Sequence, residues 1–292
     1  MQVILDTAVF EQLSLAEMAR RAQELGFDGL EIVAPHGQLA GGVLATLAAD
    51  PVGSRDLLKE YSQTLAVINA GTFAVHAQSA LQGSVQRAMQ AVDLAAAVAC
   101  PLVVFKALGD ARGPGQAQLL SAYTEGLQQA ASYAAQRGVS IAIENTGVLA
   151  RTHNLWHVHD AVGLPTCRVC IDPARSVAAG DSPSFVLLRL AGGLGMVRFT
   201  ELELDAGDEE PFVPKVSPSN PTYIVELLRG LAYRGPVCIS APADTTADDC
   251  GDYLKRAAEV VRREIERPQV VLSAYKGDKN APKFASPDRR AG

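Results

Sequence analysis

The feature that most constrains the fold is a repeat in which a short apolar run is followed by a helix-forming stretch. Continuous runs rich in Val, Ile and Leu are typical of strands covered on both faces, as in parallel sheets. Eight runs fit this description, at residues 3–7, 28–33, 65–70, 101–106, 139–144, 168–172, 196–200 and 236–240. Amphipathic stretches lie between them, and the first opens with the capping-box sequence Ser14-Leu15-Ala16-Glu17. Eight units of this kind in about 270 residues predict a single (β/α)8 TIM barrel of α/β class over residues 1–268.

The main alternative for such a pattern is an open, doubly wound sheet. That fold often binds a nucleotide phosphate on a glycine-rich loop that follows a strand. The cluster Gly192-Gly193-Leu194-Gly195 instead precedes a strand, so we interpret it as a helix stop. The sequence therefore favours the barrel.

Composition limits the functions and partners that can be expected. The chain has 292 residues and a net charge of −6, which argues against an extended nucleic-acid surface. No apolar stretch approaches the ~20 residues needed to span a bilayer, and the first residues resemble a strand rather than a signal peptide. The five cysteines are scattered and odd in number, which predicts buried thiols rather than disulfides. We expect a cytoplasmic protein with a small-molecule substrate and no nucleic-acid or membrane partner.

The last segment of the chain differs from the rest. Residues 269–292 are mostly polar, with an excess of basic side chains from Lys276 onward. This composition predicts a loosely ordered tail. A second interpretation is an arm that packs on the other subunit of a homodimer.

Charged residues at the ends of the predicted strands mark the candidate site. Glu144 closes the fifth strand and Asp172 closes the sixth. A buried carboxylate is costly unless it is paired or used, and barrel enzymes carry their active sites at this end of the strands. Lys106 ends the fourth strand, and His36 and His76 follow the second and third strands at the same rim. These residues are expected at the mouth of the barrel.

The order of several motifs resembles the xylose isomerase-like barrel superfamily over residues 1–266. The motifs are Leu25-Gly26-Phe27-Asp28-Gly29-Leu30-Glu31-Ile32, Ile141-Ala142-Ile143-Glu144-Asn145, Ile171-Asp172-Pro173-Ala174-Arg175 with Ala179-Gly180-Asp181, and Tyr233-Arg234-Gly235-Pro236-Val237. The superfamily holds sugar isomerases and epimerases, hydroxypyruvate isomerase-like proteins, inosose dehydratases and the endonuclease IV group. The resemblance thus implies carbohydrate metabolism.

The resemblance also implies a divalent metal held by Glu on strand 5, Asp on strand 6, His on strand 7 and Glu on strand 8. Glu144 and Asp172 match the first two ligands. The other two positions fall on Thr200 and Ser240, and Arg175 stands where a further His is often found. We therefore expect an altered or lost metal site and no cofactor. A rebuilt site for Mn, Mg or Zn, with Glu201 as a third ligand, is the alternative.

The function implied is an isomerase or epimerase that acts on a small carbohydrate, polyol or related hydroxy-carbonyl compound through an enediolate. Glu144 would move the proton, and Lys106 or Arg175 would stabilise the enediolate oxygen. A dehydration with the same chemistry is equally compatible. The residues expected to contact the substrate are Asp172, Arg175, Asn145, His36, His76 and Ser240.

The rival interpretation is a non-catalytic barrel that binds a sugar or a protein partner. Cleavage at abasic sites in DNA is disfavoured, because the histidine positions do not match and the charge is acidic. Without a metal, Glu144 and Asp172 would repel each other, so Lys106 or Arg175 should lie within salt-bridge reach. Arg198 and Glu201, both on the seventh strand, are expected to form a structural pair.

Overall fold

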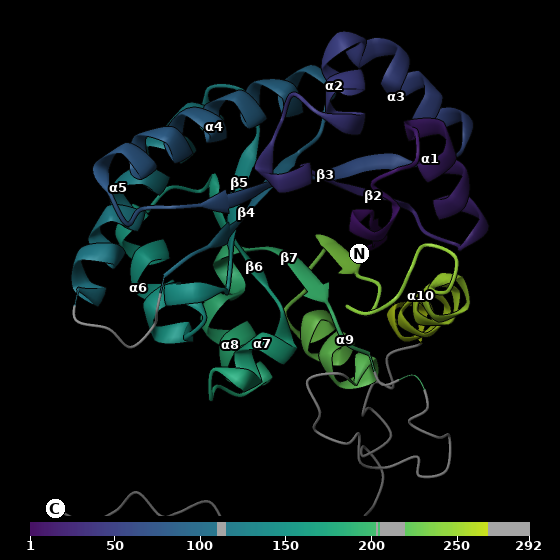
Figure 1. The fold of residues 1–292 in the computed structure, drawn as a ribbon. Coiled ribbons are helices and arrows are strands. Elements are labelled where there is room, and N and C mark those ends of the chain that lie inside the picture. The colour runs from purple at the N-terminus through teal and green to yellow at the C-terminus, as the bar shows by residue number, and fades with distance from the viewer. Residues whose placement is uncertain (110–114, 203, 205–219, 268–292) are drawn as a thin grey trace, which may run out of the picture.

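The eight predicted strands close into one parallel barrel in the computed structural model (Figure 1), which describes residues 1–109, 115–202, 204 and 220–267. Each strand pairs with its neighbours in chain order, and β8 closes on β1. The strands are β1 Gln2–Asp6, β2 Gly29–Val33, β3 Thr64–Phe73, β4 Leu102–Ala107, β5 Ser140–Glu144, β6 Cys167–Ile171, β7 Leu194–Phe199 and β8 Pro236–Ile239. The predicted fold class is confirmed. The predicted tail, residues 269–292, lies outside the described residues.

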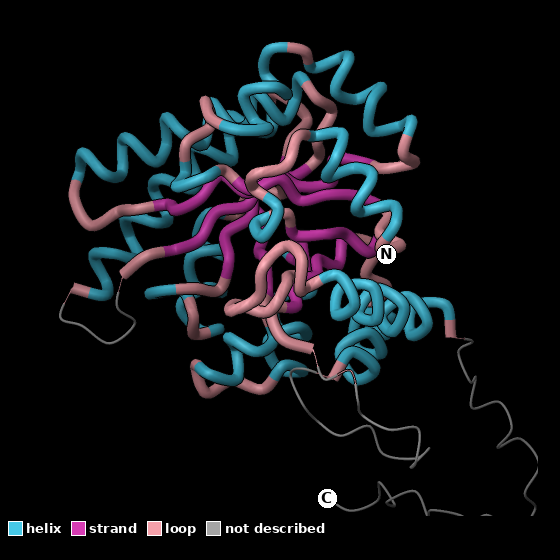
Figure 2. Tube along the Cα trace, turned by 45° about the vertical axis from the view of Figure 1, so that its right-hand side comes forward, coloured by secondary structure: helices cyan, strands magenta, loops and turns pink. Residues whose placement is uncertain are grey.

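Helices surround the strands (Figure 2) and follow most of the predicted stretches. They are α1 Leu15–Glu24, α2 Gly42–Ala49, α3 Pro51–Glu60, α4 Gln78–Ala97, α5 Gln116–Ala135, α6 Thr152–Val162, α7 Pro173–Ala178, α8 Pro183–Leu190, α9 Pro221–Gly230 and α10 Gly251–Glu266. The short helices α2 and α7 were not expected from the periodicity, since neither is long enough to show a repeated apolar face. Helix α7 matters for the site because it begins directly after Asp172, whose side chain caps it.

Two separate hydrophobic cores support the barrel. The larger core fills the space between the strands and the helices, and the smaller one fills the barrel interior. The interior core consists of Ile4, Ala66, Val67, Leu102, Val104, Ala142, Cys170, Met196 and Cys238. All five cysteines are buried and free, as predicted.

The interior core also fixes the mouth of the barrel. Side chains alternate along a strand, so a residue two positions after an interior-core residue also faces the inside of the barrel. It lies one layer closer to the carboxyl ends of the strands. Applied to each strand in turn, with Gly29 as the starting point on β2, this rule gives a ring of polar residues: Asp6, Glu31, Asn69, Lys106, Glu144, Asp172, Arg198 and Ser240. An apolar floor therefore supports a polar mouth.

Among the described residues, no helix is both long enough and apolar enough to cross a membrane.

Candidate functional site

Glu144 and Asp172 converge on one side of the mouth, and both side chains are fully buried. Nε of Arg175 lies 3.4 Å from Oε1 of Glu144 and 3.0 Å from Oδ2 of Asp172. The same Asp172 oxygen accepts a hydrogen bond of 2.7 Å from the Thr200 hydroxyl. The expected salt bridge to these carboxylates is therefore made by Arg175.

The local sequence explains why Arg175 reaches both acids. Asp172 is the N-cap of α7, and its Oδ1 accepts hydrogen bonds from the backbone N–H groups of Ala174 and Arg175. Pro173 follows at the first helical position, where its missing N–H costs nothing. The cap turns the chain so that the Arg175 side chain folds back over the ends of β5 and β6.

Asn145 acts as a brace between these two strands. Its Nδ2 donates to the carbonyl oxygen of Asp172 and to Oγ of Ser176, each at 3.0 Å, and its Oδ1 accepts from the Asp172 N–H at 2.8 Å. The residue is buried, and both halves of its amide are engaged inside the protein. Asn145, expected to contact the substrate, thus positions Asp172 in this structure.

Arg198 occupies the other side of the mouth, and here the prediction from the sequence was wrong. Its Nη1 and Nη2 lie 2.7 and 2.6 Å from the two carboxylate oxygens of Glu31. Its Nη1 also lies 3.0 Å from Oδ2 of Asp6, and its Nε lies 3.3 Å from Oε2 of Glu144. The expected partner, Glu201, lies beyond the end of β7, where it is exposed and lines the cavity above the mouth. Arg198 is therefore an interior residue.

Neutral donors complete the coordination of the acids around Arg198. The Glu31 carboxylate accepts hydrogen bonds of 2.9 Å from Nδ2 of Asn69 and from Sγ of Cys238. The Ser240 hydroxyl donates to Oδ2 of Asp6 at 2.7 Å. Ser240 therefore lies in the mouth, but its hydroxyl proton is used within the protein.

Burial and neighbouring charge shift the protonation equilibria of this cluster. Burial, followed by the charge of Glu31, raises the pKa of Asp6, and Arg198 partly opposes the rise. Burial alone would lower the pKa of Arg198, but Glu31 and Glu144 hold it well above its usual value. Burial, followed by Glu31, also raises the pKa of the Cys238 thiol well above its ordinary value. The guanidinium therefore stays charged, and the thiol stays a hydrogen-bond donor.

Glu144 differs from the other acids because it is held by charge alone. Within the described residues, neither of its carboxylate oxygens has a hydrogen-bond partner, and neither does Nε of Arg198. Among the described residues, its ion pairs are with the Nε atoms of Arg175 and Arg198. A buried carboxylate with unused acceptor positions can take up a proton or accept a hydrogen bond from a ligand.

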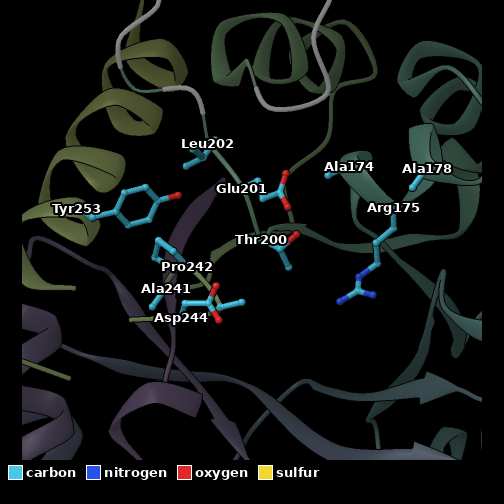
Figure 3. Close-up of a pocket in the computed structure, with 11 residues that line it drawn as sticks. Ala174, Arg175, Ala178, Thr200, Glu201, Leu202, Ala241, Pro242, Asp244 and Tyr253 are labelled. Carbon is cyan, nitrogen blue, oxygen red and sulfur yellow. The ribbon is translucent and has the colours of Figure 1, made fainter. Parts of the chain in front are cut away.

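A cavity of about 700 Å³ opens above Arg175 and Thr200. Its lining comes from the ends of β7 and β8 and from α7 and α10, and it includes Glu201, Asp244 and Tyr253 (Figure 3). The guanidinium group of Arg175 points from α7 into the open centre of this view. The Arg175 side chain is 43% exposed, so it forms the boundary between the cavity and the buried carboxylates.

The remaining predicted residues lie at different places. Lys106 is exposed at the end of β4, where its Cα pairs in register with that of Glu144, and it makes no ion pair among the described residues. His76 is exposed and lines a separate cavity between α4 and α5. His36 belongs to the short turn Pro35–Gly37 that follows β2. Glu201 is exposed and lines the main cavity.

The arrangement does not fit a divalent metal ion. Asp6, Glu31 and Cys238 could converge on one ion, since their donor atoms lie within 4.8 Å of one another. However, Nη1 of Arg198 already lies 3.0 Å from Oδ2 of Asp6, 2.7 Å from Oε2 of Glu31 and 3.6 Å from Sγ of Cys238. A metal at this point would face a permanent cation that water cannot screen. The donors expected from strands 7 and 8, Thr200 and Ser240, are hydroxyls that already donate to carboxylates.

Five residues in or directly beneath the mouth were not predicted as site residues: Asp6, Glu31, Asn69, Arg198 and Cys238. The signal for two of them was present in the sequence. Glu31 in Gly-Leu-Glu-Ile-Val and Arg198 in Met-Val-Arg-Phe are single charges inside apolar strands. The burial cost that drew attention to Glu144 applies equally to them.

Comparison with known proteins places the chain in a family. A family model described as "xylose isomerase-like TIM barrel" matches residues 19–266, and the chain belongs to this family. A solved structure of the IOLI protein with a bound zinc atom is 12% identical, with a TM-score of 0.72 over 91% of this chain and 98% of that one.

Two further structures are similar to the same extent. A D-allulose 3-epimerase from Methylomonas sp. is 19% identical, with a TM-score of 0.69 over 90% of this chain and 98% of that one. A probable 3-DHS dehydratase, AsbF from Bacillus anthracis, is 16% identical, with a TM-score of 0.68 over 90% and 99%. At these identities the likeness establishes the fold. The comparison with curated proteins found no match.

Proposed function

We propose that this chain is a metal-independent member of its family that moves a proton on a small carbohydrate, polyol or related hydroxy-carbonyl compound through an enediolate. The observation that carries the proposal is the state of Glu144. It is a buried carboxylate at the carboxyl end of the barrel, held between two guanidinium groups and without a hydrogen bond among the described residues. Epimerases and a dehydratase among the similar structures support this class of chemistry.

In the proposed reaction, a Glu144 oxygen takes a proton from the carbon next to the substrate carbonyl. The electrons of the C–H bond form the C=C bond of the enediolate, and the carbonyl oxygen gains the negative charge. Return of the proton from Glu144 to the former carbonyl carbon, with transfer of the adjacent hydroxyl proton to the former carbonyl oxygen, completes an isomerisation. If the hydroxyl on the next carbon instead takes the proton from Glu144 and leaves as water, the enediolate electrons re-form the carbonyl and a new C=C bond, which completes a dehydration.

The positive charge needed at the enediolate oxygen would come from Arg175 and Lys106. Arg175 lines the cavity, and Lys106 lies beside Glu144 in the strand register. Arg175 also covers Glu144, so a substrate can contact the base only when the guanidinium moves toward the cavity. Its 43% exposure leaves room for that movement.

Arg198 would take the electrostatic place of a metal ion. Its guanidinium supplies a fixed positive charge beside Glu144, as a bound metal ion would. Arg198 is too deeply buried to contact a substrate directly, since only 3% of its side chain is exposed. Its proposed role is therefore to hold the charge and position of Glu144.

A second candidate function is a barrel that binds a ligand without transforming it. One specific observation favours it: the two carboxylates nearest the cavity, Glu144 and Asp172, are completely covered and paired with arginine. A site used only for binding would need no movement of Arg175. The two functions therefore differ in whether Glu144 becomes accessible.

Deuterium exchange separates them. The protein is incubated in D2O with a panel of aldoses, ketoses and hydroxy acids, and deuterium at carbon is detected by NMR. The proposal predicts exchange with the wild type, loss of exchange with Glu144→Gln, and unchanged exchange with Glu60→Gln, a control on exposed α3. Calorimetric binding without any exchange would support the second function. Exchange that survives in Glu144→Gln would exclude Glu144 as the base.

A further inference from the structure

We propose that the cavity recognises a carboxylate group of its ligand through the outward edge of the Arg175 guanidinium. The inference rests on the proposed function and narrows its substrate class from neutral sugars to polyhydroxy or keto acids. It depends on which nitrogen atoms of Arg175 are already used inside the protein.

Arg175 uses only one edge of its guanidinium. Its Nε atom faces Glu144 and Asp172, at 3.4 and 3.0 Å. Among the described residues, its two Nη atoms make no hydrogen bond. The side chain is 43% exposed and lines the cavity, into which Figure 3 shows the group pointing. Two N–H donors in one plane are therefore presented to a ligand.

A free guanidinium edge selects for a particular partner. Its parallel N–H groups match the two oxygens of a carboxylate, and this pairing is stronger than a hydrogen bond to a neutral hydroxyl. Arg198 shows the same geometry already satisfied, with both of its Nη atoms on the two oxygens of Glu31. Arg175 carries the same guanidinium group, but no carboxylate is hydrogen-bonded to its Nη atoms among the described residues.

Charges in the cavity lining and beside Glu144 orient such a ligand. Lys106 adds a second exposed cation beside Glu144, without an acid of its own among the described residues. Glu201 and Asp244 line the cavity as well, and both are exposed. They would repel a carboxylate but accept hydrogen bonds from hydroxyl groups. A ligand with a carboxylate at one end and hydroxyls at the other satisfies both sets of residues.

The test compares acids with neutral compounds of matched shape. The pairs are D-glucuronate with D-glucose, D-gluconate with D-glucitol, and D-glycerate with glycerol, and glucose 6-phosphate serves as a second kind of anion. Dissociation constants are measured by calorimetry at low ionic strength with the wild type, Arg175→Gln, Arg175→Lys and Arg137→Gln. Arg137 is a matched control, because it is a partly exposed arginine paired with Asp93 on the outer helices.

We expect at least one acid to bind the wild type ten-fold or more tightly than its neutral partner. Arg175→Gln should abolish this preference, Arg175→Lys should keep a part of it, and Arg137→Gln should leave it unchanged. The inference is overturned if no acid is preferred, if the preference survives in Arg175→Gln, or if the phosphate binds more tightly than every carboxylate.

The same ligands separate this inference from the proposed function. Deuterium exchange on a neutral sugar, without any preference for acids, would support the proposed function and reject the carboxylate subsite. A preference for acids that depends on Arg175, without exchange on any compound, would support the carboxylate subsite and reject the proposed function.

Discussion

Two guanidinium groups share the mouth of the barrel, and they differ in what surrounds them. Arg198 lies among Asp6, Glu31 and Glu144, with 3% of its side chain exposed and both Nη atoms engaged. The Nε atom of Arg175 contacts Glu144 and Asp172, and the side chain is 43% exposed. Glu144 is bound by both and is the point where the two regions meet.

The difference in burial indicates that the two arginines have different roles. A fully buried arginine with several acids is fixed, because any movement would leave charges without partners and without water. A half-exposed arginine can exchange its protein partners for water or a ligand at little cost. The buried region therefore serves as electrostatic support, and the exposed region is the part available for binding. Substitution of each arginine tests whether one is fixed and the other is exchangeable.

The largest effect is expected at the buried arginine. Arg198→Met should lower the free energy of unfolding by about 3–5 kcal/mol, because three acids would lose a buried counter-charge. Urea denaturation followed by circular dichroism measures the change. A loss no greater than that of Arg137→Met, a surface control, would show that the acids are neutralised by other means.

A smaller loss of stability is expected at the exposed arginine. Arg175→Met should lower the free energy of unfolding by about 1 kcal/mol, since water can enter from the cavity and solvate Asp172. The same denaturation experiment applies. A loss as large as that of Arg198→Met would contradict the division between a fixed and an exchangeable arginine.

The buried region should also make the stability of the protein depend on pH. The pKa of Asp6 is raised in the folded state, mainly by burial and Glu31, above the ordinary value of 3.8. Its protonated form is thus favoured by folding, and stability is lost as pH rises from about 4 through the folded-state pKa. Asp6→Asn removes this loss, so its stability relative to the wild type should increase over that range. A difference that is constant between pH 3 and 8 would contradict the raised pKa.

The smallest effect on stability is expected at Lys106. This lysine is exposed and has no ion pair among the described residues, so Lys106→Met should change the free energy of unfolding by less than about 0.5 kcal/mol. Lys59→Met, which removes an exposed lysine of α3 that pairs with Asp56, is the control for binding. Binding of an acid should nevertheless weaken several-fold in Lys106→Met and not in Lys59→Met. Equal binding in both variants would remove Lys106 from the ligand site.

Some features of the fold and the site could be predicted from the sequence alone. The alternation of apolar strands and helices predicted the barrel, because a strand covered on both faces leaves a clear pattern. The rule that charges at strand ends lie at the mouth of a barrel located Glu144 and Asp172. These features depend on local periodicity, which a single sequence contains.

The pairing of the charges could not be obtained in the same way. Arg198 was assigned to Glu201 because the two are close in the chain, whereas its actual partners, Asp6 and Glu31, lie 192 and 167 residues away. The odd spacing between Arg198 and Glu201 already argued against this pair, since residues three apart on a strand face opposite sides. The choice of Arg175 over Lys106 as the partner of Glu144 depends on the helical cap at Asp172, which the strand pattern does not describe.

The central claim is that the Arg198 guanidinium takes the electrostatic place of a metal ion in this barrel. The most direct test is to dialyse the wild type and Glu144→Gln against Mn²⁺, Zn²⁺ and then metal-free buffer, and to measure bound metal by elemental analysis. The account predicts far less than one ion per chain in both proteins, and unchanged deuterium exchange by the wild type in the presence of a chelator. One tightly held ion per wild-type chain that is lost in Glu144→Gln would contradict it.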